Sequence, residues 1–290
     1  MKQLLLLLLL GVGQTVVSQQ TFPDNPLDAE FVLTDYYNFW ESFEALDATD
    51  DNPFVAYLSN ASDGLTPFVD YLNADSLYQT VLRRKCDYVT SRPVLDAIDT
   101  KKKEVQASYA AMKYWYPEAT FPPVYFVVGM FTTGGTASEN GLVIGSEMLE
   151  TLDGLNRLIS HELIHFQQNI RGTENLLKQV IKEGSADFLG ELISGELLNE
   201  DAHTYVRAHE AALHAEFAAS MLQDDYTDWL YGTSGKDDRP NDLGYWIGYK
   251  ITEAYFDQHE DKHAAIVDIL NIANPMEFLK QSGYLDAYID

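Results

Sequence analysis

One short apolar segment interrupts a chain that is otherwise patterned for helices, and it constrains the fold more than any other feature. Residues 124–131, Val-Tyr-Phe-Val-Val-Gly-Met-Phe, are rich in β-branched and aromatic side chains and directly follow Pro122 and Pro123. A run of this length and composition predicts a buried strand. Residues 141–145, Gly-Leu-Val-Ile-Gly, predict a second short strand after a Gly-containing loop over 132–140.

Apolar residues at helical spacing cover most of the remaining chain. In residues 27–48, Val32, Tyr36, Trp40 and Phe43 fall on one face and predict a helix packed on the core. Further helices are expected over 65–87, over 94–116 and from 153 onward, with a break at the Gly/Asp/Pro-rich loop 232–243. The expected class is therefore mainly α, of the α+β type, with a small β-sheet.

The first eighteen residues have the pattern of a targeting segment. Met1-Lys2-Gln3 precede seven leucines, and small residues follow as far as Ser18. This order predicts a secretory signal peptide over residues 1–18, whose apolar run is too short to span a bilayer. No cysteine follows the run, so no lipid anchor is expected there. We expect a secreted or periplasmic protein with one domain over 19–290 and no transmembrane segment in the mature chain.

The net charge of the chain excludes one class of binding partner. There are 45 Asp and Glu residues against 19 Lys and Arg, and the formal net charge is −26 at pH 7. A binder of nucleic acid needs a basic face, so no nucleic-acid partner is expected. The single cysteine, Cys86, excludes an intramolecular disulfide and a Cys-rich zinc module.

One segment carries the pattern of a catalytic metal site. Residues 161–165 read His-Glu-Leu-Ile-His within an amphipathic helical pattern. Two histidines at i and i+4 share one helical face, so both imidazole rings can reach one metal ion. Zinc held with one open coordination position lowers the pKa of a bound water to about 7, and the adjacent Glu162 can then take its proton.

Two other histidine pairs are weaker candidates for a metal site. His259 and His263 repeat the spacing, but the residues around them are charged and predict a helix end or a loop. His209 and His214 are five residues apart, which turns the second ring away from the first on a regular helix.

A third ligand is expected after His165, and Glu183 is the favoured candidate. Glu183 precedes Gly184-Ser185-Ala186-Asp187 in a predicted second helix. Asp187, four residues on, shares its face and could accept the outer N–H of a ligand histidine. An exposed carboxylate is the plain alternative for either residue in so acidic a chain. Weaker candidates for the ligand are Glu174, Glu191 and His203.

These motifs together resemble a known family. The pairing of residues 161–165 with residues 183–187 resembles the gluzincin zinc metallopeptidases. More closely, the chain is similar to secreted bacterial predicted zinc-dependent proteases related to gliding-motility lipoproteins. The stretch 161–168 carries most of the likeness, and weaker similarity extends over most of residues 31–285, including the segments 35–40, 121–126, 134–136, 141–147, 238–240 and 244–249.

The resemblance implies a zincin-like catalytic core, with a helical part over about 27–116 and a catalytic part over about 121–290. It implies Zn2+ held by His161, His165 and Glu183, with Glu162 as the catalytic base and Asp187 behind a ligand. It also implies an edge strand that pairs with substrate, for which residues 142–145 are the candidate. The oxyanion donor is left open among Tyr245, Tyr249 and Arg239.

The function expected is a secreted zinc metallopeptidase, an endopeptidase by type, that acts on peptide or protein substrates. The alternative is a non-catalytic zinc-binding envelope protein involved in assembly or surface motility. The presence of Glu162 beside both histidines favours the enzyme, because a purely structural zinc site has no need of that carboxylate.

Overall fold

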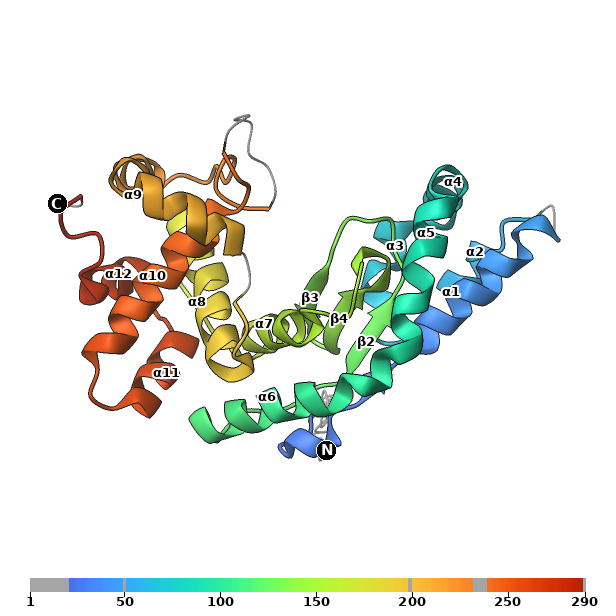
Figure 1. The fold of residues 1–290 in the computed structure, drawn as a ribbon, viewed down its shortest axis with the longest axis horizontal. Coiled ribbons are helices and arrows are strands. Elements are labelled where there is room, and N and C mark those ends of the chain that lie inside the picture. The colour runs from blue at the N-terminus through green and yellow to red at the C-terminus, as the bar shows by residue number, and fades with distance from the viewer. Residues whose placement is uncertain (1–20, 49–50, 198–199, 232–238, 289–290) are drawn as a thin grey trace, which may run out of the picture.

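A computed structural model describes residues 21–48, 51–197, 200–231 and 239–288. The predicted signal peptide therefore lies outside the described residues. The described chain is mostly helical and contains one four-stranded mixed sheet, so the predicted class is confirmed. In Figure 1 the sheet and α7 lie in the middle, with α1 to α5 on one side, α9 to α12 on the other and α6 along the bottom.

The N-terminal part consists of short helices rather than the three continuous ones that the sequence predicts. They are α1 (Thr34–Glu44), α2 (Phe54–Ser59), α3 (Val69–Leu72), α4 (Ala74–Arg83), α5 (Lys85–Ser91) and α6 (Lys102–Trp115), and a 3-10 segment, Arg92–Thr100, precedes α6.

Local backbone conformations explain the breaks. Asn73 has φ of 42° and its side chain accepts hydrogen bonds from the backbone N–H groups of Asp75 and Ser76, so one helix ends and the next begins there. Helical spacing of apolar residues does not reveal such a capping residue, because the buried face continues across the break.

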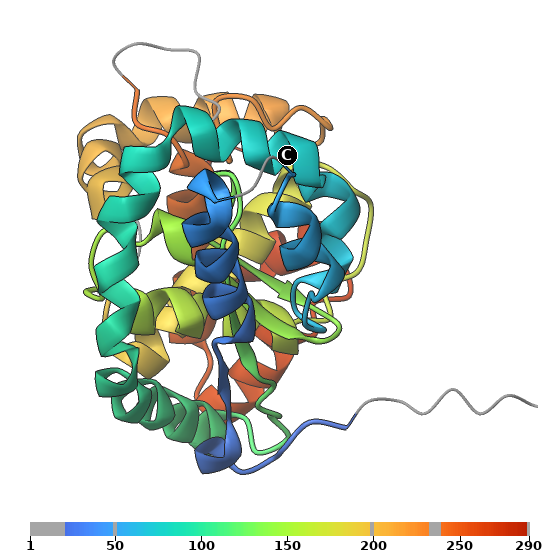
Figure 2. The ribbon, with the colours of Figure 1, turned by 90° about the vertical axis from the view of Figure 1, so that its right-hand side faces the viewer.

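The sheet has the strand order β1-β2-β4-β3. Its strands are β1 (Phe31–Val32), β2 (Val124–Val127), β3 (Gly135–Ser138) and β4 (Gly141–Gly145). β2 is parallel to β1 and β4, whereas β3 is antiparallel to β4. The predicted strands at 124–131 and 141–145 are confirmed as β2, which ends earlier, and β4. Turned by 90°, the molecule shows the N-terminal helices in front of the sheet (Figure 2).

One prediction about the sheet is wrong. Residues 142–145 belong to β4, which lies between β2 and β3, and not to an edge strand. The edge strands are β1 and β3, and β3 lies in a segment that the sequence predicts as a loop. β4 is entirely buried and apolar because it has a neighbour on both sides, whereas β3 is built from small and polar residues that give only a weak strand signal.

The C-terminal part is helical. It contains α7 (Leu155–Gln167), α8 (Leu176–Ser194), α9 (Glu200–Ser220), α10 (Leu243–Gln258), α11 (Lys262–Leu270) and α12 (Pro275–Ser282). Helices α8 and α10 approach very closely, since a β-carbon on Gly184 would overlap the backbone of Gly248 and Tyr249. This contact fixes α8, which carries Glu183 and Asp187.

None of the described helices is both long enough and apolar enough to cross a bilayer.

Candidate metal centre

Helix α7 presents both histidines of the motif toward α8. Leu155, Ile159 and Leu163 are fully or almost fully buried on the opposite stripe of α7 and fix its rotation. His161 and His165 therefore lie one turn apart on the same side, with their ring centroids 4.5 Å apart. The helix ends directly after the motif, because Gln168 has extended backbone angles.

Helix α8 brings Glu183 between the two rings. Glu183 Oε2 lies 3.0 Å from Nε2 of His165 and 3.5 Å from Nε2 of His161. One ligand atom from each of the three residues falls within 4.8 Å of the others. Burial would raise the pKa of Glu183, but the neighbouring imidazoles hold it well below its usual range. Glu183 is therefore a carboxylate, ready to bind a cation.

Two outer partners set the orientation of the rings. Asp187 is 1% exposed, and its Oδ1 lies 2.7 Å from Nδ1 of His161. The side-chain Oε1 of Gln168 lies 2.8 Å from Nδ1 of His165, and the amide Nε2 of Gln168 donates to the Lys182 carbonyl and to Ser185 Oγ. With Nδ1–H donating outward on each ring, both Nε2 atoms are left to face Glu183.

Asp187 thus accepts from the outer N–H of a candidate ligand histidine, which is the contact proposed for it from the sequence. The corresponding contact of Gln168 with His165 was not predicted. Gln168 is the C-cap of α7 and has extended backbone angles, so its three-residue spacing from His165 does not by itself predict where its side chain lies. Its presence three residues after the motif was visible in the sequence, but its contact depends on where α8 runs.

Glu162 lies beside the ligand group under the edge strand. It is 5% exposed, and burial raises its pKa, although His161 and His165 oppose the rise. Strand β3 passes so close that a β-carbon on Gly135 would lie 2.7 Å from Glu162 Oε1. Glycine at this position therefore leaves the room that the carboxylate occupies.

An open cavity of about 540 Å³ is lined by His161, Glu162, His165 and Glu183. Its polar lining includes Lys182, Tyr231 and Tyr245 in addition to the motif residues, and β3 with its preceding loop supplies Thr132, Thr133, Gly135, Thr136 and Ala137. The site is therefore bounded on one side by the outer edge of β3, which pairs with no further strand among the described residues, and on the other by α8 and α10.

The two tyrosines of the cavity come from different elements. Tyr245, on α10, stacks beside His161 with ring centroids 6.2 Å apart. Burial, followed by the charge of Glu183, raises its pKa far above the usual value, so it stays a hydrogen-bond donor. Tyr231, which was not predicted, donates to Glu183 Oε1 at 3.3 Å.

Several predicted candidates lie elsewhere. Tyr249 follows Tyr245 by one turn, but its hydroxyl donates to Glu191 Oε2 at 2.7 Å, outside the cavity. Arg239 pairs with Glu216 at 2.7 Å and stacks over Trp229. These two residues therefore do not provide an oxyanion donor in this arrangement.

Two of the weaker ligand candidates, Glu174 and Glu191, have side-chain partners other than the histidines. Glu174 is paired with Lys178, Glu191 is bound by Tyr249, and the side chain of His203 is outside the described residues. In the second histidine pair of i, i+4 spacing, His259 follows the end of α10, whereas His263 lies in the first turn of α11 and contacts the Trp115 carbonyl. The two histidines of the second motif are thus on different elements, and within the described chain only His161, His165 and Glu183 form a potential metal group.

The arrangement defines a class of potential metal site. A His-His-carboxylate group, with a second carboxylate beside it, lies next to the edge strand β3. Residues 127–275, just over half of the chain, match the family model described as Predicted Zn-dependent protease (DUF2268). The chain belongs to this family. No curated protein matches the chain. No solved structure matches it either.

Proposed function

We propose that the protein is a secreted zinc-dependent metallopeptidase of gluzincin type that hydrolyses internal peptide bonds. The observation that carries the proposal is the convergence of His161, His165 and Glu183 within 4.8 Å, with buried Glu162 beside them. The family description supports the same function. In this proposal residues 1–18 are the signal peptide and residues 19–290 form the mature enzyme.

The donor set fits a catalytic zinc site. Two neutral imidazoles and one carboxylate are the ligands of many catalytic zinc ions, which keep a further position open. The hydrogen bonds of Asp187 and Gln168 to the two Nδ1 atoms are the outer contacts that such sites require. When bound, zinc supplies a Lewis acid that polarises a carbonyl and lowers the pKa of water to about 7.

The residues of the chain account for the remaining steps. Glu162 accepts a proton from the attacking water and passes it to the amine that leaves. Its raised pKa suits it to both steps, because such a carboxylate holds a proton more readily than an exposed one. Tyr245, and Tyr231 beside Glu183, supply phenol hydroxyls on the cavity wall that can donate to the oxyanion.

The free edge of β3 is the place for an extended substrate. An added peptide strand forms main-chain hydrogen bonds with such an edge, and these bonds do not depend on the peptide's sequence. Because Gly135 of β3 lies against Glu162, a peptide paired with β3 passes directly beside the catalytic carboxylate. In this proposal β3 binds the substrate, the role that was predicted from the sequence for residues 142–145.

The test is hydrolysis of a peptide library by the zinc-loaded protein. We expect cleavage that stops on addition of a chelator and returns with zinc. The variant Glu162→Gln should keep its zinc and lose about 10²–10⁴ of the rate, the usual contribution of a positioned general base. Exposed Glu260→Gln, from the second motif, is the matched control. Unchanged hydrolysis by Glu162→Gln would remove Glu162 as the base.

A further inference from the structure

The cavity around the metal group, which we call the metal cavity, has two facing walls. Strand β3 forms one wall, because Gly135 lies against Glu162. Helix α8 forms the other wall, because Glu183 lies against His165. Helix α7 packs against both walls and carries Glu162 and His165 between them. A peptide that pairs with β3 therefore enters the metal cavity and lies between the two walls.

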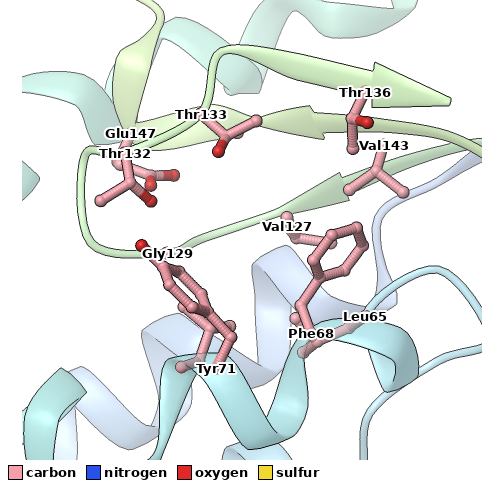
Figure 3. A pocket seen from close by; sticks show the side chains of 12 residues that line it. Leu65, Phe68, Tyr71, Val127, Gly129, Thr132, Thr133, Thr136, Val143 and Glu147 are labelled. Atoms are coloured by element: carbon pink, nitrogen blue, oxygen red, sulfur yellow. The ribbon is translucent and has the colours of Figure 1, made fainter. Parts of the chain in front are cut away.

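The register of β3 determines which side chains of that peptide point into the metal cavity. Gly135 faces Glu162 of α7. The side chain of the next residue, Thr136, points to the opposite face of the sheet, beside Val143 (Figure 3). Side chains of a strand alternate between the two faces of a sheet. Every second side chain of a peptide paired with β3 therefore points toward α7 and the metal group.

Among the described residues that line the metal cavity, one is a lysine and none is an arginine. It is Lys182 of α8, which is half-buried and directly precedes Glu183. Its backbone carbonyl accepts a hydrogen bond at 2.9 Å from the amide of Gln168, the residue that also contacts His165. The base of this side chain is therefore fixed relative to the metal group, and its flexible four-carbon stem carries a compact positive charge.

The ammonium group of Lys182 has no ion-pair partner among the described residues. One turn earlier on α8, Lys178 pairs with Glu174, whereas Lys182 forms no such pair. Its charge nevertheless acts on the metal cavity. Burial raises the pKa of Glu162, and the charges of the two motif histidines and of Lys182 oppose the rise. The ammonium group is therefore close enough to meet a ligand in the metal cavity.

The charges of the lining favour an anion beside Lys182. Glu162 and Glu183 are the carboxylates of the lining, and together they balance the charge of one bound Zn2+. Because the two imidazoles are neutral as zinc ligands, Lys182 is then the remaining charge of the described lining. The net charge of −26 repels acidic peptides at longer range, but physiological salt screens such repulsion beyond roughly 8 Å. A carboxylate that reaches Lys182 therefore meets a local attraction.

We propose that Lys182 is a specificity-determining residue that binds a carboxylate of the peptide held along β3. The inference rests on the proposed peptidase function. A hydrogen bond from the ammonium group to a carboxylate is about twice as strong as one between neutral groups. The carboxylate belongs to an acidic side chain that points toward α7, or to the C-terminus of a peptide that ends in the metal cavity. Both sources have the same chemistry, and separate peptides distinguish them.

The experiment measures binding apart from catalysis, at physiological ionic strength. Zinc-loaded Glu162→Gln protein is titrated with eight-residue Ser/Ala peptides, blocked at both ends, that carry one glutamate moved along the sequence. Each has a counterpart with glutamine at the same position, which has the same shape without the charge. A second pair compares the Ser/Ala peptide with a free C-terminal carboxylate and with a C-terminal amide. We expect the carboxylate member of one pair to bind about three- to tenfold more tightly, between the values for an exposed ion pair and for a buried hydrogen bond to a charged group.

Substitutions of the lysine identify the contact, with each variant compared at full zinc occupancy. In the Glu162→Gln background, Lys182→Met should bring the affinity ratio of that pair close to one, and Lys182→Glu should reverse the preference. Lys178→Met is the matched control and should keep the ratio, because Lys178 is on the same helix, pairs with Glu174 and does not line the metal cavity.

Three results would overturn the proposal. They are ratios close to one for both kinds of pair, a ratio unchanged by Lys182→Met, as for a contact with the peptide main chain, and no binding of any peptide. A carboxylate preference that depends on Lys182, in a protein whose wild type cleaves nothing, would refute the peptidase function and leave this contact standing. Cleavage by a wild type without such a preference would refute only the role of Lys182.

Discussion

The hydrogen bond from His161 to Asp187 gives the sharpest prediction for zinc affinity. Asp187 is 1% exposed, and its Oδ1 lies 2.7 Å from His161 Nδ1. Removing such an outer partner of a ligand histidine typically lowers metal affinity about 10- to 100-fold, or roughly 1.4–2.7 kcal/mol. Asp187→Ala, which removes the acceptor altogether, should lie at the upper end of this range.

The isosteric variant separates charge from geometry. Asp187→Asn can still accept from Nδ1–H but without the charge, and a charge-assisted hydrogen bond is about twice as strong as a neutral one. We therefore expect about a tenfold loss of zinc affinity, near the lower end of the range. The ring should keep its orientation, so a peptidase saturated with zinc should retain most of its rate.

The assay is competition for zinc against a chromophoric chelator at neutral pH. Asp257→Asn, an exposed carboxylate on α10, is the matched control and should bind zinc as the wild type does. Circular dichroism confirms that each variant is folded. The reasoning is refuted if Asp187→Asn and Asp187→Ala both bind zinc within about twofold of the wild type, well below the expected loss.

Three further substitutions test other parts of the account. Gly135→Ala should push the Glu162 carboxylate aside and lower the rate of hydrolysis with zinc content unchanged, and full activity would contradict the contact between β3 and Glu162. Gly184→Ala should cost more than about 2 kcal/mol in urea unfolding, because its β-carbon would overlap the backbone of α10. Gly190→Ala on the same helix, whose β-carbon would lie 3.4 Å from its nearest neighbour, is the control and should cost little. Burial lowers the pKa of His214, with Glu210 opposing, so its contribution to stability is present above about pH 6.5 and is lost as the pH falls toward the lowered value. His214→Gln should flatten the loss of stability as the pH falls below about 6.5, and an equally steep loss in this variant would assign the loss to other groups.

The sequence predicts the parts of the site that depend on local spacing. The i, i+4 relation of His161 and His165 is a property of one helix, and so is the relation of Glu183 to Asp187. That the two pairs meet depends on the close packing of α8 against α10, which positions α8, and on the end of α7 at Gln168. Glycines such as Gly184 and Gly248 are compatible with close helix packing, but the sequence does not identify which helices pack together.

The missed features all depend on long-range neighbours. β3 has almost no apolar side chains, so only its pairing with β4 makes it a strand. Tyr231 precedes the undescribed residues 232–238 and reaches Glu183 from a loop. Tyr249 shares a helix face with Tyr245, but one turn of α10 is enough to bring its hydroxyl to Glu191 instead of the cavity.

Zinc stoichiometry tests the central claim most directly. Measured by mass spectrometry of metals on the purified protein, the wild type and Glu162→Gln should each hold about one zinc ion per chain, as a three-ligand site predicts. The double variant His161→Gln/His165→Gln, folded by circular dichroism, should hold none. Full zinc content in that double variant, or a wild type that binds no zinc, would contradict the account.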